Sequence, residues 1–132
     1  MPTIVRRPIT TIIETRREVI HATGWQVRST IWMPPTDVYE TEESLIIKVE
    51  VAGMRDDDFE IAVQENTLLI SGTRPDQNER RAYHQMEIMF GKFEIAIQLP
   101  MQIDIDKAYA EYKDGFLTIT FPRIRQHTNE VE

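Results

Sequence analysis

The chain has 132 residues, of which 41% are hydrophobic and 28% charged, and its formal net charge is −7. This length and balance suit one globular domain with an appendage rather than a disordered chain. There is no cysteine, which excludes disulfides, thiolate metal sites and a cysteine nucleophile. The N-terminal residues carry frequent charges and no apolar run of signal-peptide or membrane-spanning length, so we expect a cytoplasmic location and no membrane partner.

Charge is distributed unevenly along the chain. Residues 1–31 carry five arginines against two glutamates, whereas residues 32–132 carry ten lysines or arginines against twenty acidic residues. The acidic body argues against nucleic acid as a partner, since phosphate binding needs a basic surface. The basic N-terminal arm could contact the acidic body of its own or a neighbouring chain, or its charges could simply be solvated.

The arm, residues 1–31, has a helical rhythm. Its apolar residues recur at intervals of roughly three to four positions, the period of an amphipathic helix. The pattern predicts a helix that begins near Thr10 or Thr11, after the break at Pro8, and ends near Gly24. Because a short helix is marginal alone, we expect it to pack on another surface or to stay mobile.

From Trp32 onward the apolar period changes to two, which is typical of half-buried β-strands. Strands are predicted at residues 45–51, 59–63, 67–71 and 93–99. Between the second and third of these, Glu65-Asn66 is predicted to form a two-residue turn.

The strongest local signal lies in residues 110–122. Asp114-Gly115 separates two runs of β-forming residues, and a type I′ turn needs a positive φ at both central positions, which Asp and Gly tolerate. Alternate residues of the segment 117–121 then share an apolar face. Pro122 ends the strand because it has no N–H for a ladder bond.

Short strands at this spacing predict an all-β fold, an antiparallel immunoglobulin-like β-sandwich. We expect three regions: a partly helical N-terminal arm over residues 1–31, a sandwich domain over residues 32–122, and a short flexible C-terminal tail over residues 123–132. The polar segment 74–81 interrupts the strand pattern, and its charge predicts an excursion away from the sandwich.

Metal binding is not supported by the sequence. His21, His84 and His127 lie in different regions, whereas a metal site needs convergent ligands. Residues 56–58 are three consecutive aspartates, but the alternating ligands and closing Glu of a calcium loop are missing, so a turn is the better interpretation. No metal and no cofactor is expected.

A carboxylate pair is the one candidate for catalysis. Asp104 and Asp106 could do acid–base work, but no nucleophile, phosphate loop or cofactor motif accompanies them. A solvated connection explains them better, and we do not expect an enzyme.

Several segments resemble one known family. They are residues 35–41, 51–54, 57–63, 68–72, 83–100 and the closing signature of Ala110, Asp114, Gly115 and Leu117. In this order and spacing they resemble the α-crystallin domain of small heat shock proteins, over roughly residues 32–122. The resemblance implies an ATP-independent holdase, a chaperone that binds unfolding client proteins and suppresses their aggregation under stress.

The resemblance also implies that the arm contacts clients through apolar residues. The candidates are Ile9, Ile12, Ile13, Val19, Ile20, Trp25, Val27 and Ile31. They could instead complete the core of a dimer, and both roles can hold together. Binding of clients would act through non-directional burial of apolar surface, which suits a promiscuous partner range.

In the bacterial and plant branch of the family, the excursion carries a strand that pairs with the sheet of a second copy. The residues implied for this homodimer contact are Tyr83, His84, Met86, Ile88 and Phe90. Two positions depart from the family, because Ile88 and Ile95 stand where Arg is usual, so the usual ionic contacts cannot form through them.

A tail motif, I-x-I or I-x-V, docks in a groove of a neighbouring domain in this family. The corresponding groove residues would be Ile61, Val63 and Tyr109, but the tail offers only Ile124 as an anchor. We therefore expect dimers or small oligomers rather than a large closed assembly. The rival to the holdase is a p23-like co-chaperone or adaptor module that binds one defined protein partner.

Overall fold

The computed structural model describes residues 6–8 and 31–124, and the predicted helix of the arm lies outside these residues. The elements in chain order are β1 (Arg6–Pro8), β2 (Thr36–Glu40), β3 (Ser44–Glu50), β4 (Phe59–Gln64), β5 (Thr67–Arg74), β6 (Gly91–Gln98), the 3-10 turn η1 (Ile105–Lys107), β7 (Tyr109–Lys113) and β8 (Phe116–Pro122). All strand pairs are antiparallel. The prediction of an all-β antiparallel fold is confirmed.

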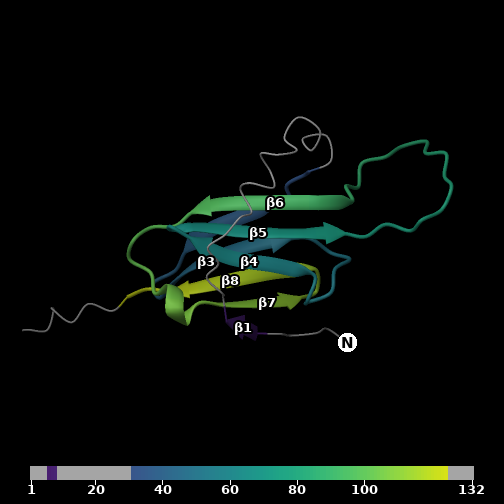
Figure 1. Cartoon of the computed structure of the whole chain (residues 1–132). Helices are drawn as coiled ribbons and strands as arrows, with labels where there is room; N and C mark the ends of the chain where they lie inside the picture. Colours follow the sequence, from purple (N-terminus) through teal and green to yellow (C-terminus); the bar gives the residue numbers. More distant parts are fainter. Residues whose placement is uncertain (1–5, 9–30, 125–132) are drawn as a thin grey trace, which may run out of the picture.

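Two sheets pack face to face (Figure 1). One has five strands in the order β1-β7-β8-β3-β2, and the other has three in the order β4-β5-β6. Alternate residues of β3 to β8 face the space between the sheets, and wholly buried side chains fill this space. Those with 0% exposure are Ile47, Val49, Val51, Leu68, Phe93, Ile119 and Phe121.

The two predicted turns are confirmed in their backbone geometry. Glu65 and Asn66 have φ values of 53° and 65°, and Asp114 and Gly115 have 54° and 85°. Left-handed conformations at both central positions match the twist of the flanking strands, so each pair closes a tight hairpin. These hairpins join β4 to β5 and β7 to β8.

Gly72 makes room for the wholly buried ring of Phe93. A Cβ at this position would lie 2.8 Å from Phe93 Cζ and 3.0 Å from the Asp58 carbonyl oxygen. The Phe93 ring packs edge-on against Trp32 at 5.6 Å between centroids and lies 6.3 Å from that of Phe59. Because Gly72 has no side chain, the rings of Phe93, Trp32 and Phe59 can pack together at one end of the core.

Two short pairings were not expected from the sequence. β1 pairs with β7, placing Arg6 opposite Glu111 and Pro8 opposite Tyr109. Trp32 forms an isolated parallel bridge with Phe93, through backbone bonds to Lys92 and from Glu94. Segments on both sides of residues 9–30 therefore attach to sheet edges, one on each sheet.

Candidate functional site

The excursion, defined here as residues 75–90, is the part of the described chain that projects farthest from the sandwich (Figure 1). It leaves β5 after Arg74 and returns at Gly91, which are cross-strand partners. No residue within it belongs to a strand. A strand needs a neighbour for its N–H and C=O groups, and no strand of residues 6–8 and 31–124 pairs with the excursion.

Most of the predicted dimer-contact residues lie exposed on the excursion. Exposure is 48% for Tyr83, 65% for Met86 and 64% for Ile88, and His84 is also exposed. Phe90 differs, because it lies half-buried at the base of the excursion. The structure thus brings four of the five residues to one exposed segment.

Met89, at 50% exposure, extends this apolar surface and was missed from the sequence. Met89 lies between residues 88 and 90 and therefore does not fit the alternation of residues 86, 88 and 90. A run of apolar residues in an otherwise polar excursion was the signal that could have found it.

An ionic cluster orders the first half of the excursion. Arg81 Nη1 lies 3.2 Å from Asp76 Oδ1, and Arg81 Nε lies 2.9 Å from Glu79 Oε2. Arg81 also donates to the Tyr83 hydroxyl at 2.6 Å. Hydrogen bonds to Tyr83 and Glu79 raise the pKa of Arg81, so its charge persists at every relevant pH.

A sheet edge without a strand partner can pair with an extended segment of another chain. β2 is the outermost strand of the five-stranded sheet, beyond β3, and its outer edge has no strand partner in the described part of the chain. Val38 and Tyr39 on β2 are 48% and 44% exposed. Unpaired edges bearing apolar side chains pair readily with another chain.

The residues predicted for the tail-docking groove do not meet on one surface. Ile61 and Val63 share the inner face of β4 with Phe59, and Val63 is only 3% exposed. Tyr109 lies on the outer face of β7, because its neighbour Ala110 is the buried one. The strand alternation that places Ala110 inside necessarily turns Tyr109 away from the β4 residues.

β1 occupies part of the β7 edge, next to Tyr109, one of the predicted groove residues. It pairs along the whole length from Tyr109 to Glu111 on β7, so this edge is already occupied by the chain's own arm. A segment from a neighbour would have to displace β1 or use another edge.

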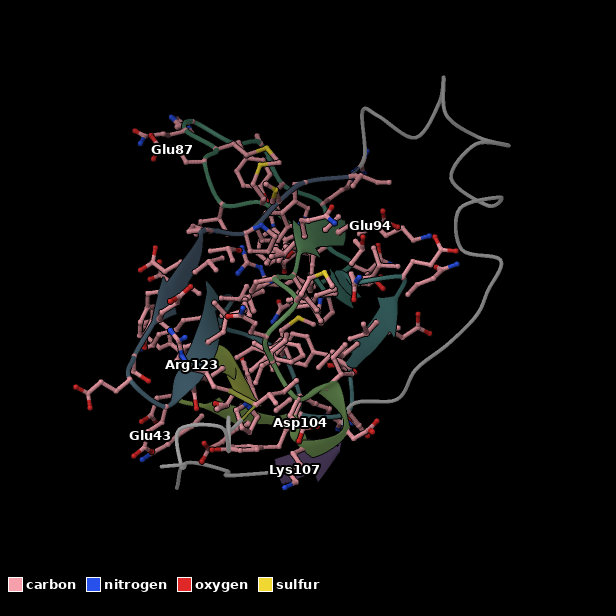
Figure 2. The ribbon with its side chains drawn as sticks, turned by 90° about the vertical axis from the view of Figure 1, so that its left-hand side faces the viewer. Glu43, Glu87, Glu94, Asp104, Lys107 and Arg123 are labelled. Atoms are coloured by element: carbon pink, nitrogen blue, oxygen red, sulfur yellow. The ribbon has the colours of Figure 1, made fainter. Side chains whose placement is uncertain are left out.

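The predicted tail anchor, Ile124, is held by its own domain. Its backbone N–H donates to the Gln102 carbonyl at 3.1 Å, and Arg123 donates to the Glu43 carbonyl at 2.9 Å. Arg123 also forms an ion pair with Glu40 at 2.5 Å. Figure 2 shows Arg123 and Glu43 at the opposite end of the molecule from Glu87 of the excursion.

Ile124 is nevertheless 51% exposed. It lines a shallow depression on the outer face of the five-stranded sheet together with Tyr109, Thr120 and Pro122. Residues 123 and 124 of the predicted tail are thus bonded to the domain, and residues 125–132 lie outside the described chain.

The two positions that depart from the family have different surroundings. Ile95 is 3% exposed and faces the core from β6, opposite Ile70. Ile88 is exposed on the excursion. An Arg at position 95 would have to bury its charge, so the apolar residue suits this core, whereas Ile88 adds apolar surface.

The remaining predicted arm residues, from Ile9 to Val27, lie outside the described chain, and Ile31 is half-buried next to Trp32. Among residues 6–8 and 31–124, no cluster of His, Asp and Glu could hold a metal ion. Asp58 accepts a hydrogen bond from the Arg55 backbone at 2.9 Å, as expected for a turn.

The carboxylate pair is part of the connection that precedes β7. Asp104 lies 4.0 Å from Lys107 Nζ, and its backbone N–H donates to the Pro122 carbonyl at 2.7 Å. Asp106 is exposed within η1. This arrangement holds a turn against β8, and Figure 2 shows Asp104 and Lys107 close together near the bottom of the view.

Comparison with known proteins places the chain in a family. The model of the Hsp20/alpha crystallin family matches residues 37–132. The chain belongs to this family. The small heat shock protein C4 of Rickettsia felis is 33% identical over 98 residues, covering 73% of this chain and 60% of that protein. The chain thus spans less than two thirds of that relative.

Solved structures of small heat shock proteins share the fold. Heat shock protein 16.0 of Schizosaccharomyces pombe superposes with a TM-score of 0.64 at 26% identity, covering 76% of this chain and 81% of that chain. A small heat-shock protein of Xylella fastidiosa, described as having a distinct high order structure, gives 0.67 at 24% identity, covering 74% and 91%. In the described part of this small heat shock protein, no helix has the length and apolar character needed to cross a membrane.

Proposed function

We propose that this small heat shock protein is an ATP-independent holdase that acts in the cytoplasm and not an enzyme. It binds unfolding proteins through exposed apolar surface and so suppresses their aggregation. The observation that carries this proposal is membership of a chaperone family, together with large apolar side chains that stay exposed outside the excursion, where Met33 and Met101 are 66% and 79% exposed. Apolar surface that the dimer contact leaves uncovered is available to a client.

The functional unit in this proposal is a homodimer. The excursion of one copy adds a strand to the β2 edge of the other, which supplies partners for the backbone groups of both. Met86 and Ile88 would then pack near Val38 and Tyr39, covering side chains that are exposed in the single chain. Because the contact is reciprocal, two such additions form one symmetric interface.

Client binding would be the task of the arm and of apolar residues left outside the dimer contact. Met33 and Met101 are 66% and 79% exposed. Thioether side chains adapt to many shapes, which suits a surface that receives unrelated clients. The relatives named as heat shock proteins support this role.

The test of the function is suppression of aggregation without nucleotide. Several unrelated clients are heated with and without the chain, and light scattering is followed. Protection of all of them at comparable ratios is the expected result. Protection of a single client only would favour the p23-like adaptor, and protection of none would refute the holdase.

The arm and the excursion can be tested separately. Deleting residues 1–31 is expected to leave a folded sandwich that protects clients much less, because the apolar residues of the arm are lost. Replacing residues 75–90 by a short Gly-Ser linker is expected to yield monomers in light scattering. A dimer that survives the second change would place the interface elsewhere.

A further inference from the structure

Arg74, the last residue of β5, binds the end of the excursion through its guanidinium group. Its Nε and Nη2 atoms both donate to the Met89 carbonyl oxygen, at 3.0 and 2.6 Å. Its Nη1 atom donates to the Ala52 carbonyl oxygen at 3.2 Å. One side chain therefore joins the excursion to the connection between β3 and β4.

The same guanidinium lies against two aromatic rings. Its central carbon is 4.6 Å from the centroid of the Trp32 ring and 5.4 Å from that of Phe90. Both distances fall within the range of a cation–π contact, for which Trp is the best partner. Arg74 thus contacts the excursion through Phe90 and the end of the arm through Trp32.

Trp32 is the residue at which the arm joins the sandwich. Its indole N–H donates to the Gly91 carbonyl at 3.1 Å, and its backbone bridges to β6. Residues 9–30 lie immediately upstream, beyond Ile31. A change that weakens the contacts of the Trp32 ring therefore acts at the junction between the arm and the domain.

We propose that Arg74 couples the order of the excursion to the attachment of the arm at Trp32. When Phe90 and the Met89 carbonyl are in place, the guanidinium is held over the Trp32 ring. When the excursion moves away, Arg74 loses the partners that orient it, and its contact with Trp32 weakens. The coupling is reciprocal by thermodynamic necessity, so release of Trp32 also loosens the excursion.

This coupling deepens the proposed function and rests on it for its biological meaning. The excursion is the proposed dimer contact, and the arm is the proposed client-binding segment. Arg74 then links the two, so that a dimer that opens at the excursion also releases the arm junction. A planar guanidinium suits this position, because Lys offers no fork for the shared carbonyl and stacks poorly on rings.

The test uses Trp32 as a reporter in the full-length chain. The chain has two tryptophans, Trp25 and Trp32, so a Trp25→Phe background leaves one. In this background Phe90→Ala is expected to raise the acrylamide quenching of Trp32 about two- to five-fold, the shift in population that loss of one exposed cation–π contact produces.

The matched control is Arg81→Ala, which removes contacts to Asp76, Glu79 and Tyr83 in the first half of the excursion but none of the contacts of Arg74 with the Met89 carbonyl and Phe90. It is expected to leave Trp32 quenching unchanged. Light scattering is used to choose a concentration at which all variants have the same oligomeric state. The dimer and the coupling are thus measured by different signals, and either can fail without the other.

A double-mutant cycle assigns the coupling to Arg74. In an Arg74→Ala chain, Trp32 quenching is expected to be high already and Phe90→Ala to add nothing; Arg74→Lys serves the same purpose if the alanine variant does not fold. If Phe90→Ala leaves Trp32 quenching unchanged, or raises it equally with and without Arg74, the proposal is wrong.

Discussion

The sandwich and the excursion both have alternating apolar side chains, but the sandwich buries them and the excursion exposes them. In the sandwich, alternate apolar residues of both sheets face one another, and Phe93 and Ile119 are entirely buried. In the excursion, Met86 and Ile88 also alternate, but they are exposed because no second layer lies opposite them. The comparison teaches that alternation marks a face that needs covering, and that the cover can come from another chain.

Polar groups show the same division. Ser71 is the one buried polar side chain in the described residues apart from the tyrosine hydroxyl of Tyr112. The excursion instead carries the Arg81 cluster at its surface. Exposed ion pairs contribute little stability, so the excursion is held mainly at its two ends.

The largest effect on stability should come from removing the ring of Phe93. Phe93→Ala is expected to lower the free energy of unfolding by about 3–5 kcal/mol, because it leaves a cavity beside Gly72. Denaturant unfolding would measure this. Phe116→Ala is the matched control, since Phe116 is 37% exposed on the outer face, and it should cost much less. Equal losses of unfolding free energy in the two variants would contradict the assignment of Phe93 to the core.

A smaller effect on a different quantity is expected in the excursion. Ile88→Ser should leave the unfolding free energy of the separated monomer unchanged but raise the dissociation constant of the dimer about tenfold or more, as expected when a buried aliphatic side chain is lost from an interface. Analytical ultracentrifugation would report it. Met101→Ser, at a position that is 79% exposed outside the excursion, should not change dimerisation. A similar shift in both variants would contradict the assigned interface.

A substitution in the tail adds an apolar side chain for contact between chains, whereas the substitutions above remove apolar side chains. Gln126→Ile rebuilds a second anchor after Ile124, and native mass spectrometry at micromolar concentration should show a shift toward larger oligomers. The shift should be modest, because Ile124 is bonded to Gln102 of its own domain and β1 occupies the β7 edge. An unchanged distribution would show that the tail does not limit assembly, and a dominant closed assembly in the original chain would refute the expectation of small oligomers.

The smallest effect concerns the buried hydroxyl of Tyr112. It donates to the Val51 carbonyl at 2.8 Å, and its loss in Tyr112→Phe should cost about 0.5–1.5 kcal/mol at neutral pH. Burial raises the pKa of Tyr112 above its unfolded value. The stabilisation is therefore complete below pH of about 10 and falls as the pH rises further, because the unfolded chain ionises first.

The difference in stability between the original chain and Tyr112→Phe should accordingly narrow above that pH. Denaturant unfolding from pH 7 to 11 would show this. Tyr39→Phe, at an exposed position on β2, is the control and should match the original chain throughout. A constant difference for Tyr112→Phe would show that the hydroxyl titrates alike in both states.

Local signals in the sequence were sufficient for the strands β3 to β8. The hairpins at Glu65-Asn66 and Asp114-Gly115 follow from backbone preferences of the residues themselves, and the strands follow from alternation. β1 could not be found this way, because a three-residue strand containing Pro8 has no period to detect. β2 was not assigned, since most of its residues are exposed and it lies at a sheet edge.

The interaction surfaces were only partly predictable. The exposed residues of the excursion came from the family resemblance, but the position of Tyr109 on the outer face follows from alternation with Ala110 and could have been predicted. The contacts of Arg74 could not, because they join residues 15 to 42 positions apart through the fold. Such contacts depend on tertiary structure rather than on local pattern.

The thioethers of the excursion have a chemical consequence. This chain has no cysteine, so methionine is its only sulfur, and Met86 and Met89 are both at least half exposed. Peroxide would convert them to sulfoxides sooner than the half-buried Met54, replacing apolar surface with a polar, chiral group. The methionines of the proposed partner contact thus also make the excursion sensitive to oxidation, and methionine sulfoxide reductases could restore them.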